Sequence, residues 1–503
     1  MASLRRDIAR PNHGAIPTSS GHGLIWHMPR LALGTLGTAV RVVAVTILTG
    51  CVPNHRPIAP SAPLGPANGP VHSTFFFKTA ASDFDGDSVE VRFSWGDGDT
   101  SIWSSRVRSG DTVEMAHSWS TPGTYAVKTQ AADAHGSLSS WSNEHATAVY
   151  PGWTLGGADR DECQSVLATP DGGCVMTGYT LSNDTGVWLA KTDAHGSMLW
   201  SKAFGGAYSD RGYCVQQTTD SGFVVAGEYP VCLIRVDGSG NKLWDRSFHG
   251  GGYSDRGLSV RPTTDGGFVV TGSALFSCPP DTYYYDVFLL RTDADGQGLW
   301  ERSFGGPDYS CGYDVQQTSD GGFAIVGSVG SGTAVWLIKT DGNGNTLWSR
   351  TFGGSGYQCG LSLWLTSDGG FAISGYTDSQ GAGLADVWLI KTDESGNLKW
   401  DKTYGGTGRD FGNSVLQTAD GGYVIGGSTN SFGSGWYDFW LVRTDKNGDK
   451  LWDRTFGGSY DDVCESVQPT ADGGYILAGT TQSYGAGGCD AYVVKTDTSG
   501  NPK

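Results

Sequence analysis

The stretch from residue 414 to residue 458 decides the fold of most of this chain. It contains four apolar or alternating segments: Ser-Val-Leu-Gln-Thr at 414–418, Tyr-Val-Ile-Gly at 423–426, Asp-Phe-Trp-Leu-Val-Arg-Thr at 438–444 and Lys-Leu-Trp-Asp-Arg-Thr-Phe at 450–456. Short segments of this kind, separated by turns rich in glycine and aspartate, predict β-strands. One such stretch is therefore expected to form a four-stranded antiparallel meander.

The same pattern recurs seven times along the chain. The triplet Asp-Gly-Gly begins at Asp171, Asp265, Asp320, Asp368, Asp420 and Asp472, and Asp220-Ser-Gly supplies the seventh copy. A second motif, a basic residue followed by Thr-Asp or a close variant, also occurs once in each repeat. Its aspartates are Asp193, Asp237, Asp293, Asp341, Asp393, Asp445 and Asp497. Seven units of four strands predict an all-β fold, a seven-bladed β-propeller over residues 150–503.

The fourth strand of six repeats carries a tryptophan, and the seventh repeat reaches Lys503 before that position. The six are Trp200, Trp244, Trp300, Trp348, Trp400 and Trp452. At the other end of the repeats, Trp153-Thr-Leu-Gly-Gly at 153–157 matches the missing strand. We predict that residues 150–155 complete the seventh blade, because this closure removes the edges of an open array.

The repeats resemble the Asp-Gly-Gly/Lys-Thr-Asp/Leu-Trp propeller repeats of bacterial and archaeal surface proteins. That resemblance covers about 350 residues and implies the fold alone. The recurring tryptophans and basic residues occupy the same position in each repeat, so we interpret them as parts of the blade architecture.

Residues 1–51 have the features of an export signal. Arginines precede the apolar run at 42–50, which is too short to span a bilayer, and Leu48-Thr-Gly-Cys51 resembles the lipobox of bacterial lipoproteins. The resemblance implies cleavage before Cys51 and lipidation of its thiol, and we expect translation to start at Met28. An ordinary buried or disulfide-bonded cysteine is the alternative.

Two further segments precede the repeats. Residues 52–70 hold six prolines and predict a stiff spacer without a core of its own. Residues 71–149 alternate as a small β-sandwich, and Trp95-Gly-Asp-Gly-Asp99 with His117-Ser-Trp-Ser-Thr-Pro-Gly-Thr-Tyr125 resembles polycystic-kidney-disease (PKD) domains. In its turn, Asp83, Asp85 and Asp87 could bind calcium, but a hydrogen-bonded turn is the stronger interpretation.

Composition excludes one class of partner. The formal charge is −17, and the 34 basic residues are dispersed, so binding to nucleic acid is not expected. No zinc-type cysteine spacing and no catalytic motif such as Gly-x-Ser-x-Gly occurs. We expect a monomer that reaches the membrane only through its lipid anchor.

The candidate binding residues lie where the repeat is broken. The third repeat has the long strand-connecting loop 276–286, and we predict a partner contact through Tyr283, Tyr284 and Tyr285. The loops joining consecutive blades carry Asp161, Asp210, Asp255, Asp410 and Asp462. They predict an acidic face for calcium or a cationic partner, unless these carboxylates hydrogen-bond between blades.

The ten cysteines have no single role. Cys174 and Cys232 replace an aromatic residue at their positions in the second and third strands of the repeat, which predicts buried free thiols. Cys163 with Cys464, and Cys311 with Cys359, share columns in adjacent blades and could form disulfides after export.

The leading hypothesis is a lipoprotein, anchored at the cell surface or outer membrane, that presents its propeller to a protein or glycan without catalysis. We predict no cofactor, with calcium as the one candidate ion. The alternative is a propeller enzyme, either polysaccharide-active or quinoprotein-like, that uses non-repeated carboxylates near the centre as acid and base.

Overall fold

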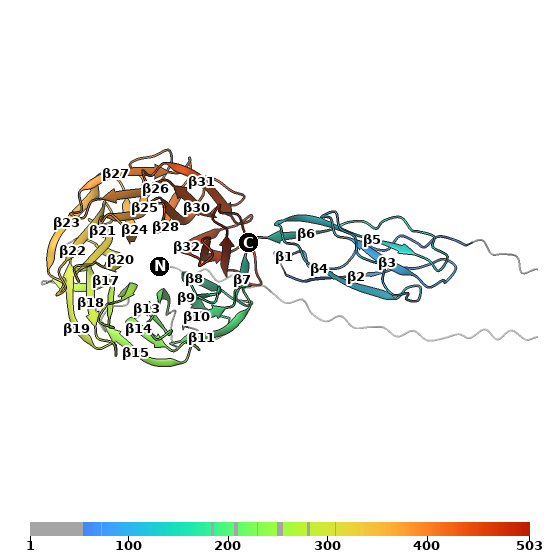
Figure 1. Ribbon diagram of the computed structural model, residues 1–503, viewed down its shortest axis with the longest axis horizontal. Coiled ribbons are helices and arrows are strands. Elements are labelled where there is room, and N and C mark those ends of the chain that lie inside the picture. The colour runs from blue at the N-terminus through green and yellow to red at the C-terminus, as the bar shows by residue number, and fades with distance from the viewer. Residues whose placement is uncertain are drawn as a thin grey trace, which may run out of the picture. The chain divides into compact units, whose positions relative to one another are not determined.

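The computed structural model describes residues 54–71, 73–182, 186–205, 210–228, 230–248, 255–278, 282–306 and 308–503. The side chains of residues 276–278, 282 and 283 are not described. In this part of the chain every regular element is a β-strand (Figure 1). No helix within these ranges is long and apolar enough to cross a membrane. The export signal and Cys51 lie outside the described residues.

The first six strands form the small sandwich. They are β1 (Asn68–Pro70), β2 (Phe75–Ala80), β3 (Glu90–Ser94), β4 (Thr112–His117), β5 (Gly123–Ala132) and β6 (His145–Tyr150). One sheet has the order β1-β6-β5-β3, and β2 pairs with β4 in the other. Alternate residues of β2 and β3 point inward, so Phe75, Phe77 and Phe93 pack on Trp119 and Trp95 in a common core.

The sandwich includes most of the segment expected to be a free spacer. Asn68–Pro70 pairs in parallel with Ala148–Tyr150, and Leu64 bridges to Lys78. Pro57, Pro60 and Pro63 are buried. The predicted boundary between spacer and domain at residues 70 and 71 is therefore wrong, because these prolines contribute apolar surface to the sandwich.

Within the described residues, seven four-stranded sheets follow the sandwich, and Figure 1 shows them around a common centre. The first strands lie nearest that centre: β8 (Asp161–Ala168), β12 (Gly212–Gln217), β16 (Arg256–Pro262), β20 (Cys311–Gln317), β24 (Gln358–Leu365), β28 (Asp410–Gln417) and β32 (Asp462–Pro469). The second strands are β9 (Cys174–Thr180), β13 (Phe223–Gly227), β17 (Phe268–Cys278), β21 (Phe323–Val329), β25 (Phe371–Thr377), β29 (Tyr423–Thr429) and β33 (Tyr475–Thr481).

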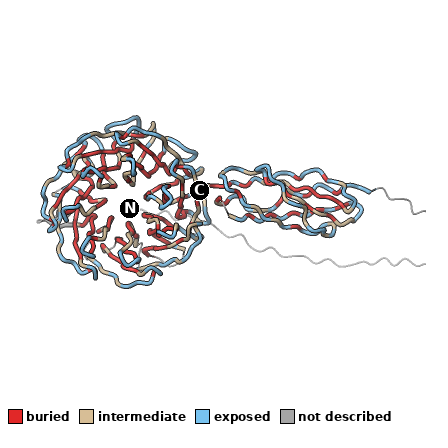
Figure 2. The backbone as a smooth tube through the Cα atoms, in the orientation of Figure 1, coloured by how far each residue is buried: buried red, intermediate tan, exposed pale blue. Residues whose placement is uncertain are grey.

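The two outer strand positions follow the same order. The third strands are β10 (Gly186–Thr192), β14 (Val231–Val236), β18 (Thr282–Thr292), β22 (Ala334–Thr340), β26 (Asp386–Thr392), β30 (Asp438–Thr444) and β34 (Asp490–Thr496). The fourth are β11 (Met198–Phe204), β15 (Lys242–Phe248), β19 (Gly298–Phe304), β23 (Thr346–Gly353), β27 (Leu398–Tyr404) and β31 (Lys450–Phe456), with β7 (Trp153–Leu155) beside β34. Figure 2 shows the inner strands buried and the outer rim exposed.

The tryptophans of the fourth strands join neighbouring sheets. Each one packs on the aromatic residue that opens the second strand of the next sheet, with ring centroids 5.7–6.4 Å apart. Each also covers a turn glycine of the next sheet, such as Gly240 with φ of 78° beside Trp200. A side chain there would collide with the indole, and positive φ favours glycine. These contacts confirm the architectural interpretation of the tryptophan column.

β7 supplies the equivalent contacts for the last sheet. Trp153, Thr154 and Leu155 pair with Val493, Tyr492 and Ala491 of β34. The Trp153 indole covers Gly196 of the sheet that contains β8, as Trp200 covers Gly240. Cys174 stands where the other six sheets carry an aromatic residue, and it packs in the same cluster as Trp153.

Candidate binding site

The antiparallel sheets bring two sets of loops to the same end of the ring. The loops that precede the first strands and the loops between second and third strands both lie there, since first strands begin where second strands end. We call this end of the sheets the loop end. Both sets of candidate residues from the sequence belong to it.

The predicted tyrosine loop is an extension of a hairpin. β17 and β18 are eleven residues long, and Tyr283, Tyr284 and Tyr285 pair with Ser277, Phe276 and Leu275. Tyr284 and Tyr285 are half-buried, and the Tyr285 ring lies 5.4 Å from that of Tyr309 in the next connecting loop. Part of this tyrosine surface therefore packs on the neighbouring sheet, and its contact with a partner stays a prediction.

The predicted acidic face is wrong for the carboxylates that the structure describes in detail. Asp462 is fully buried, its Oδ2 accepts hydrogen bonds from Gly458 N and Ser483 Oγ at 2.7 Å, and its Oδ1 accepts one from the Thr481 hydroxyl. Asp161 and Asp410 are buried with equivalent partners, and buried Asp255 accepts from Leu275 N. These carboxylates are hydrogen-bonded, but their side-chain partners lie in the second strand of the same sheet, in the loop after it and in the turn before the first strand, not in another blade.

The described residues contain no cluster of side chains arranged as metal ligands. No set of three or more His, Cys, Asp or Glu side chains is placed there to hold a metal ion. Asp83 Oδ1 instead accepts from Asp85 N and Asp87 N at 2.8 and 3.2 Å, which forms the expected hydrogen-bonded turn. Calcium binding stays a prediction.

Several aromatic side chains of the loop end are largely exposed to solvent. Trp436 is 72% exposed, Tyr357 64% and Tyr460 63%. The loop that carries Trp436 contacts the next connecting loop, since Asp462 N donates to Tyr437 O at 2.7 Å. The sequence analysis did not select these residues, although each is an aromatic residue in a loop at this end of the sheets.

Half-buried aromatic rings continue this surface toward the centre of the ring. The Phe411 ring, on the innermost strand β28, lies 5.1 Å from Tyr376 and 6.1 Å from Tyr437. Arg409 is exposed two residues before Phe411. Burial raises the pKa of Tyr437, and the charge of Arg409 opposes that rise. We call Tyr376, Phe411, Trp436, Tyr437 and Tyr460 the aromatic side of the loop end.

Charged residues occupy the corresponding positions in the first three sheets. Glu162 pairs with Arg160 and, at 3.3 Å, with Arg211. Glu228 pairs with Arg256 at 3.2 Å and with Arg211 at 3.9 Å. We call these five residues the charged side of the loop end.

The charged side presents mainly positive charge to solvent. The Glu162 and Glu228 side chains are 6% and 4% exposed, whereas those of Arg160, Arg211 and Arg256 are 56%, 32% and 44% exposed. Glu228 also accepts from the Tyr213 hydroxyl at 2.8 Å. Burial raises the pKa of Glu228, while the Tyr213 hydrogen bond and the charge of Arg256 oppose the rise.

Each first strand contains a β-bulge that leaves one residue unpaired. The bulges fall at Gln164, Tyr213, Leu258, Tyr313, Leu361, Asn413 and Glu465. The backbone irregularity is the same in every sheet, but the side chain differs in chemistry. Burial, together with the charge of Glu162, raises the pKa of Glu465 to about 7, and Asn413 Nδ2 donates to Glu465 Oε2 at 3.3 Å.

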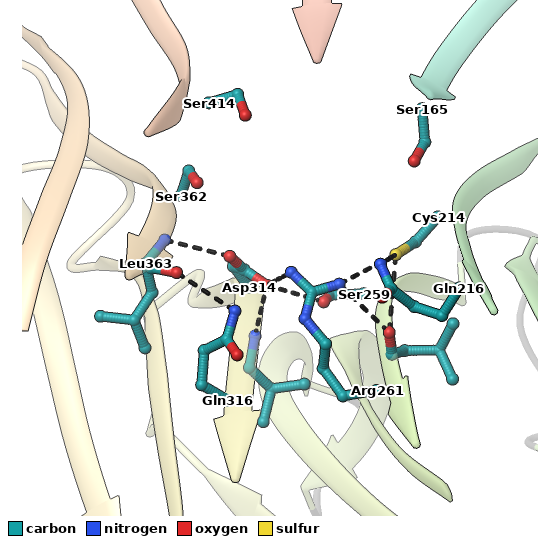
Figure 3. A network of polar contacts seen from close by, with 12 residues as sticks. Ser165, Cys214, Gln216, Ser259, Arg261, Asp314, Gln316, Ser362, Leu363 and Ser414 are labelled. Atoms are coloured by element: carbon teal, nitrogen blue, oxygen red, sulfur yellow. Dashed lines mark hydrogen bonds and ion pairs between the residues drawn. The ribbon is translucent and has the colours of Figure 1, made fainter. Parts of the chain in front are cut away.

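A polar network links the innermost strands one layer further from the loop end (Figure 3). Asp314 Oδ1 accepts from Ser259 Oγ at 2.8 Å and from Arg261 at 2.9 Å, and Asp314 Oδ2 accepts from Leu363 N at 3.0 Å. In other sheets a serine takes the place of Asp314, as Ser362 does when it accepts from Val415 N. The network holds three successive sheets together, and its polar atoms bond within the protein.

The described cysteines are free thiols. Cys163, Cys174, Cys311, Cys359 and Cys464 are buried and unpaired, so the two predicted disulfides are not formed in this structure. Cys174 confirms the prediction of a buried thiol, whereas Cys232 is only half-buried.

Comparison with known proteins identifies one domain of the chain. Residues 58–145 match the family model of the PKD domain. The regulatory protein FlaEY of Caulobacter vibrioides is 29% identical over 144 residues, which cover 24% of this chain and 15% of that protein. The chain thus corresponds to a small part of that relative.

Two solved structures are also similar. The PKD domain of an M14-like peptidase from a Thermoplasmatales archaeon is 32% identical and covers 19% of this chain and 97% of its own, with a TM-score of 0.18. A quinonprotein alcohol dehydrogenase-like protein from Bacteroides thetaiotaomicron is 9% identical over 77% of this chain and 93% of its own, with a TM-score of 0.41. The chain is an all-β protein in which a PKD domain precedes a propeller-like array of four-stranded sheets.

Proposed function

We propose that this chain is an exported surface lipoprotein whose seven-bladed propeller binds a protein or glycan partner at its loop end. The observation that carries the proposal is the set of exposed aromatic side chains gathered there, with Trp436 the most exposed. Aromatic side chains on rigid scaffolds supply large contact areas at low entropic cost. The PKD domain is consistent with a surface location.

Closure of the ring is part of this proposal. The pairing of β7 with β34 and the position of Trp153 over Gly196 support seven blades, with the last one completed by the strand after the PKD domain. A closed ring holds its loops in fixed relative positions, and a preorganised surface loses less entropy on binding.

The lipid on Cys51 would keep this surface at the membrane. Mass spectrometry of mature protein from a bacterial host should find diacylglyceryl cysteine there, and an unmodified thiol would contradict the anchor.

The binding role is tested with the full chain carrying Cys51→Ala, which cannot be lipidated. Screening this protein against panels of glycans and of extracellular proteins should identify at least one ligand. The Trp436→Ala variant should bind that ligand at least tenfold more weakly. Leu243→Ala is the control, because Leu243 is 55% exposed on an outer strand. Binding that both variants retain would contradict the role of the loop end.

An enzymatic role is the second candidate, and the carboxylate of Glu465 favours it. Its pKa of about 7, raised by burial and by Glu162, would let it act as a general acid or base near neutral pH. Polysaccharide hydrolysis that Glu465→Gln abolishes would favour the enzyme, and so would absorbance of a quinone cofactor. A binding protein should show neither.

A further inference from the structure

We propose that the loop end binds an acidic saccharide, with sugar rings on its aromatic side and sugar carboxylates on the arginines of its charged side. This inference rests on the proposed binding function and names the ligand class. The inference combines the aromatic side and the charged side of the loop end. The residues of both sides occupy positions at which the repeats differ from one another.

The arginines provide the first part of the argument. Arg160, Arg211 and Arg256 come from connecting loops or first strands of three successive sheets, and buried Glu162 and Glu228 hold them by ion pairs. Each guanidinium has five donors in a planar fork, so it can pair with more than one carboxylate, as Arg211 does with Glu162 and Glu228. Because the glutamates are buried and the arginines are partly exposed, an incoming ligand meets positive charge.

The aromatic side provides the second part. The Phe411 ring contacts the rings of Tyr376 and Tyr437, and exposed Trp436 precedes Tyr437 in its loop. The surrounding turns are rich in glycine and serine, so flat apolar faces stand among polar groups. Pyranose rings have the same character, with apolar C–H faces and hydroxyl-bearing edges. Tyrosine and tryptophan suit such surfaces because one end is apolar and the other is hydrated.

The two sides share one end of the ring. Phe411 in β28 corresponds in position to Arg256 in β16 and to Arg211 directly before β12. The three residues lie three positions before Ser414, Ser259 and Cys214 respectively. Arg409 adds a guanidinium next to the aromatic side. An extended ligand with alternating ring faces and carboxylates would match this distribution better than a neutral glycan, because only a charged ligand could form ion pairs with the partly exposed guanidinium groups.

The test compares two forms of one polymer. Isothermal titration of the full Cys51→Ala chain is carried out with oligogalacturonate and with its methyl ester, which keeps the sugar backbone and removes the charge. We expect the acid to bind at least tenfold more tightly than the ester. The difference should shrink between 50 and 300 mM salt, because exposed charges are screened.

Variants assign the two sides separately. Arg256→Gln and the more exposed Arg160→Gln should each weaken the acid at least fivefold and leave the ester unchanged. Trp436→Ala should weaken both forms. Lys446→Gln, an exposed lysine in a turn between outer strands, controls for net charge and should change neither. If the thermal transition of Arg256→Gln equals that of wild type, misfolding does not explain its weaker binding. If that transition shifts, the binding of Arg160→Gln provides the test instead.

Other outcomes overturn the inference in distinguishable ways. Equal binding of acid and ester that depends on Trp436 would reject the acidic ligand but keep the binding function. Tighter binding of poly-glutamate than of oligogalacturonate would make the partner an acidic protein segment. No binding of either sugar form would reject the saccharide, and a null result in the full glycan and protein panels would reject the proposed function as well.

Discussion

At the scale of single residues, the structure separates side chains that repeat from those that occur once. Asp314 stands in a strand position that serine holds in most sheets, and it binds Ser259, Arg261 and the Leu363 backbone. A carboxylate here can bridge three strands because it accepts several hydrogen bonds at once. Its cost is the burial of charge, which Arg261 offsets.

Removing Asp314 should therefore destabilise the propeller. Asp314→Ala leaves the Arg261 guanidinium, the Ser259 hydroxyl and the Leu363 N–H without this acceptor, and the expected loss is about 3 kcal/mol of unfolding free energy. Urea denaturation followed by tryptophan fluorescence measures it. Asp245→Ala breaks an exposed pair with Lys242 and should change stability by less than about 0.5 kcal/mol. Equal effects of the two variants would contradict the network.

The carboxylate of Glu465 should make stability depend on pH near neutrality. Its pKa is raised to about 7, so it contributes stability below the unfolded pKa of about 4.3, and that contribution is lost as pH rises toward 7. Wild-type protein should lose more thermal stability between pH 5 and pH 8 than Glu465→Gln, which cannot ionise. Calorimetry at the two pH values tests this difference. Glu394→Gln, at an exposed site, should behave like wild type.

At the scale of elements, the short strand β7 has a role beyond its three residues. It continues the sheet that ends with β34 and places Trp153 against the turn at Gly196 of another sheet. The hairpin β17–β18, in contrast, is long: each of its strands has four residues more than the usual seven. Such a change in length alters the surface but leaves the ring unchanged.

Trp153→Ala should destabilise the propeller by about 3 kcal/mol, because it removes a packed indole between the first and last sheets. Thermal unfolding of the full chain measures the loss. Trp436→Ala is a matched control, because it removes an exposed tryptophan and should change stability by less than about 0.5 kcal/mol. If Trp153→Ala unfolds at the wild-type temperature, β7 does not close the ring.

At the scale of the whole molecule, one ion pair recurs in most sheets and sets the response to acid. The carboxylate that opens each Asp-Gly-Gly turn pairs with a basic residue of its own third strand, as Asp171 does with Lys191 at 2.5 Å. The hydrogen bond from Lys191 lowers the pKa of Asp171 to about 2. Burial opposes the shift at Asp320, yet the Lys339 hydrogen bond lowers its pKa to about 2 as well.

These pairs predict acid unfolding below pH 4. A lowered pKa contributes stability above the unfolded value of about 3.9, and that stability is lost as pH falls toward 2. The thermal transition of the propeller should therefore fall steadily between pH 4 and pH 2 in a calorimetric series. A transition that stays constant over this range would contradict a stabilising role for the repeated pairs.

The repeat, the strands and the PKD domain can be predicted from the amino-acid sequence. Turn glycines, the Asp-Gly-Gly carboxylates and the tryptophan column act over short distances, so their spacing reveals the local structure that they impose. The same local chemistry identified Trp153 as the partner of the last repeat, because a strand that lacks its neighbour must find one elsewhere.

The side chains that the loop end exposes depend on tertiary packing. Asp410 and Asp462 look like surface acids in the sequence, but packing between turns buries them among hydroxyl and amide donors. Glu228 and Arg256 meet although 28 residues separate them, because the end of β13 lies beside the start of β16 in the next sheet. Burial and contact across sheets depend on how the sheets pack around their centre, and the pattern within any one repeat does not contain that arrangement.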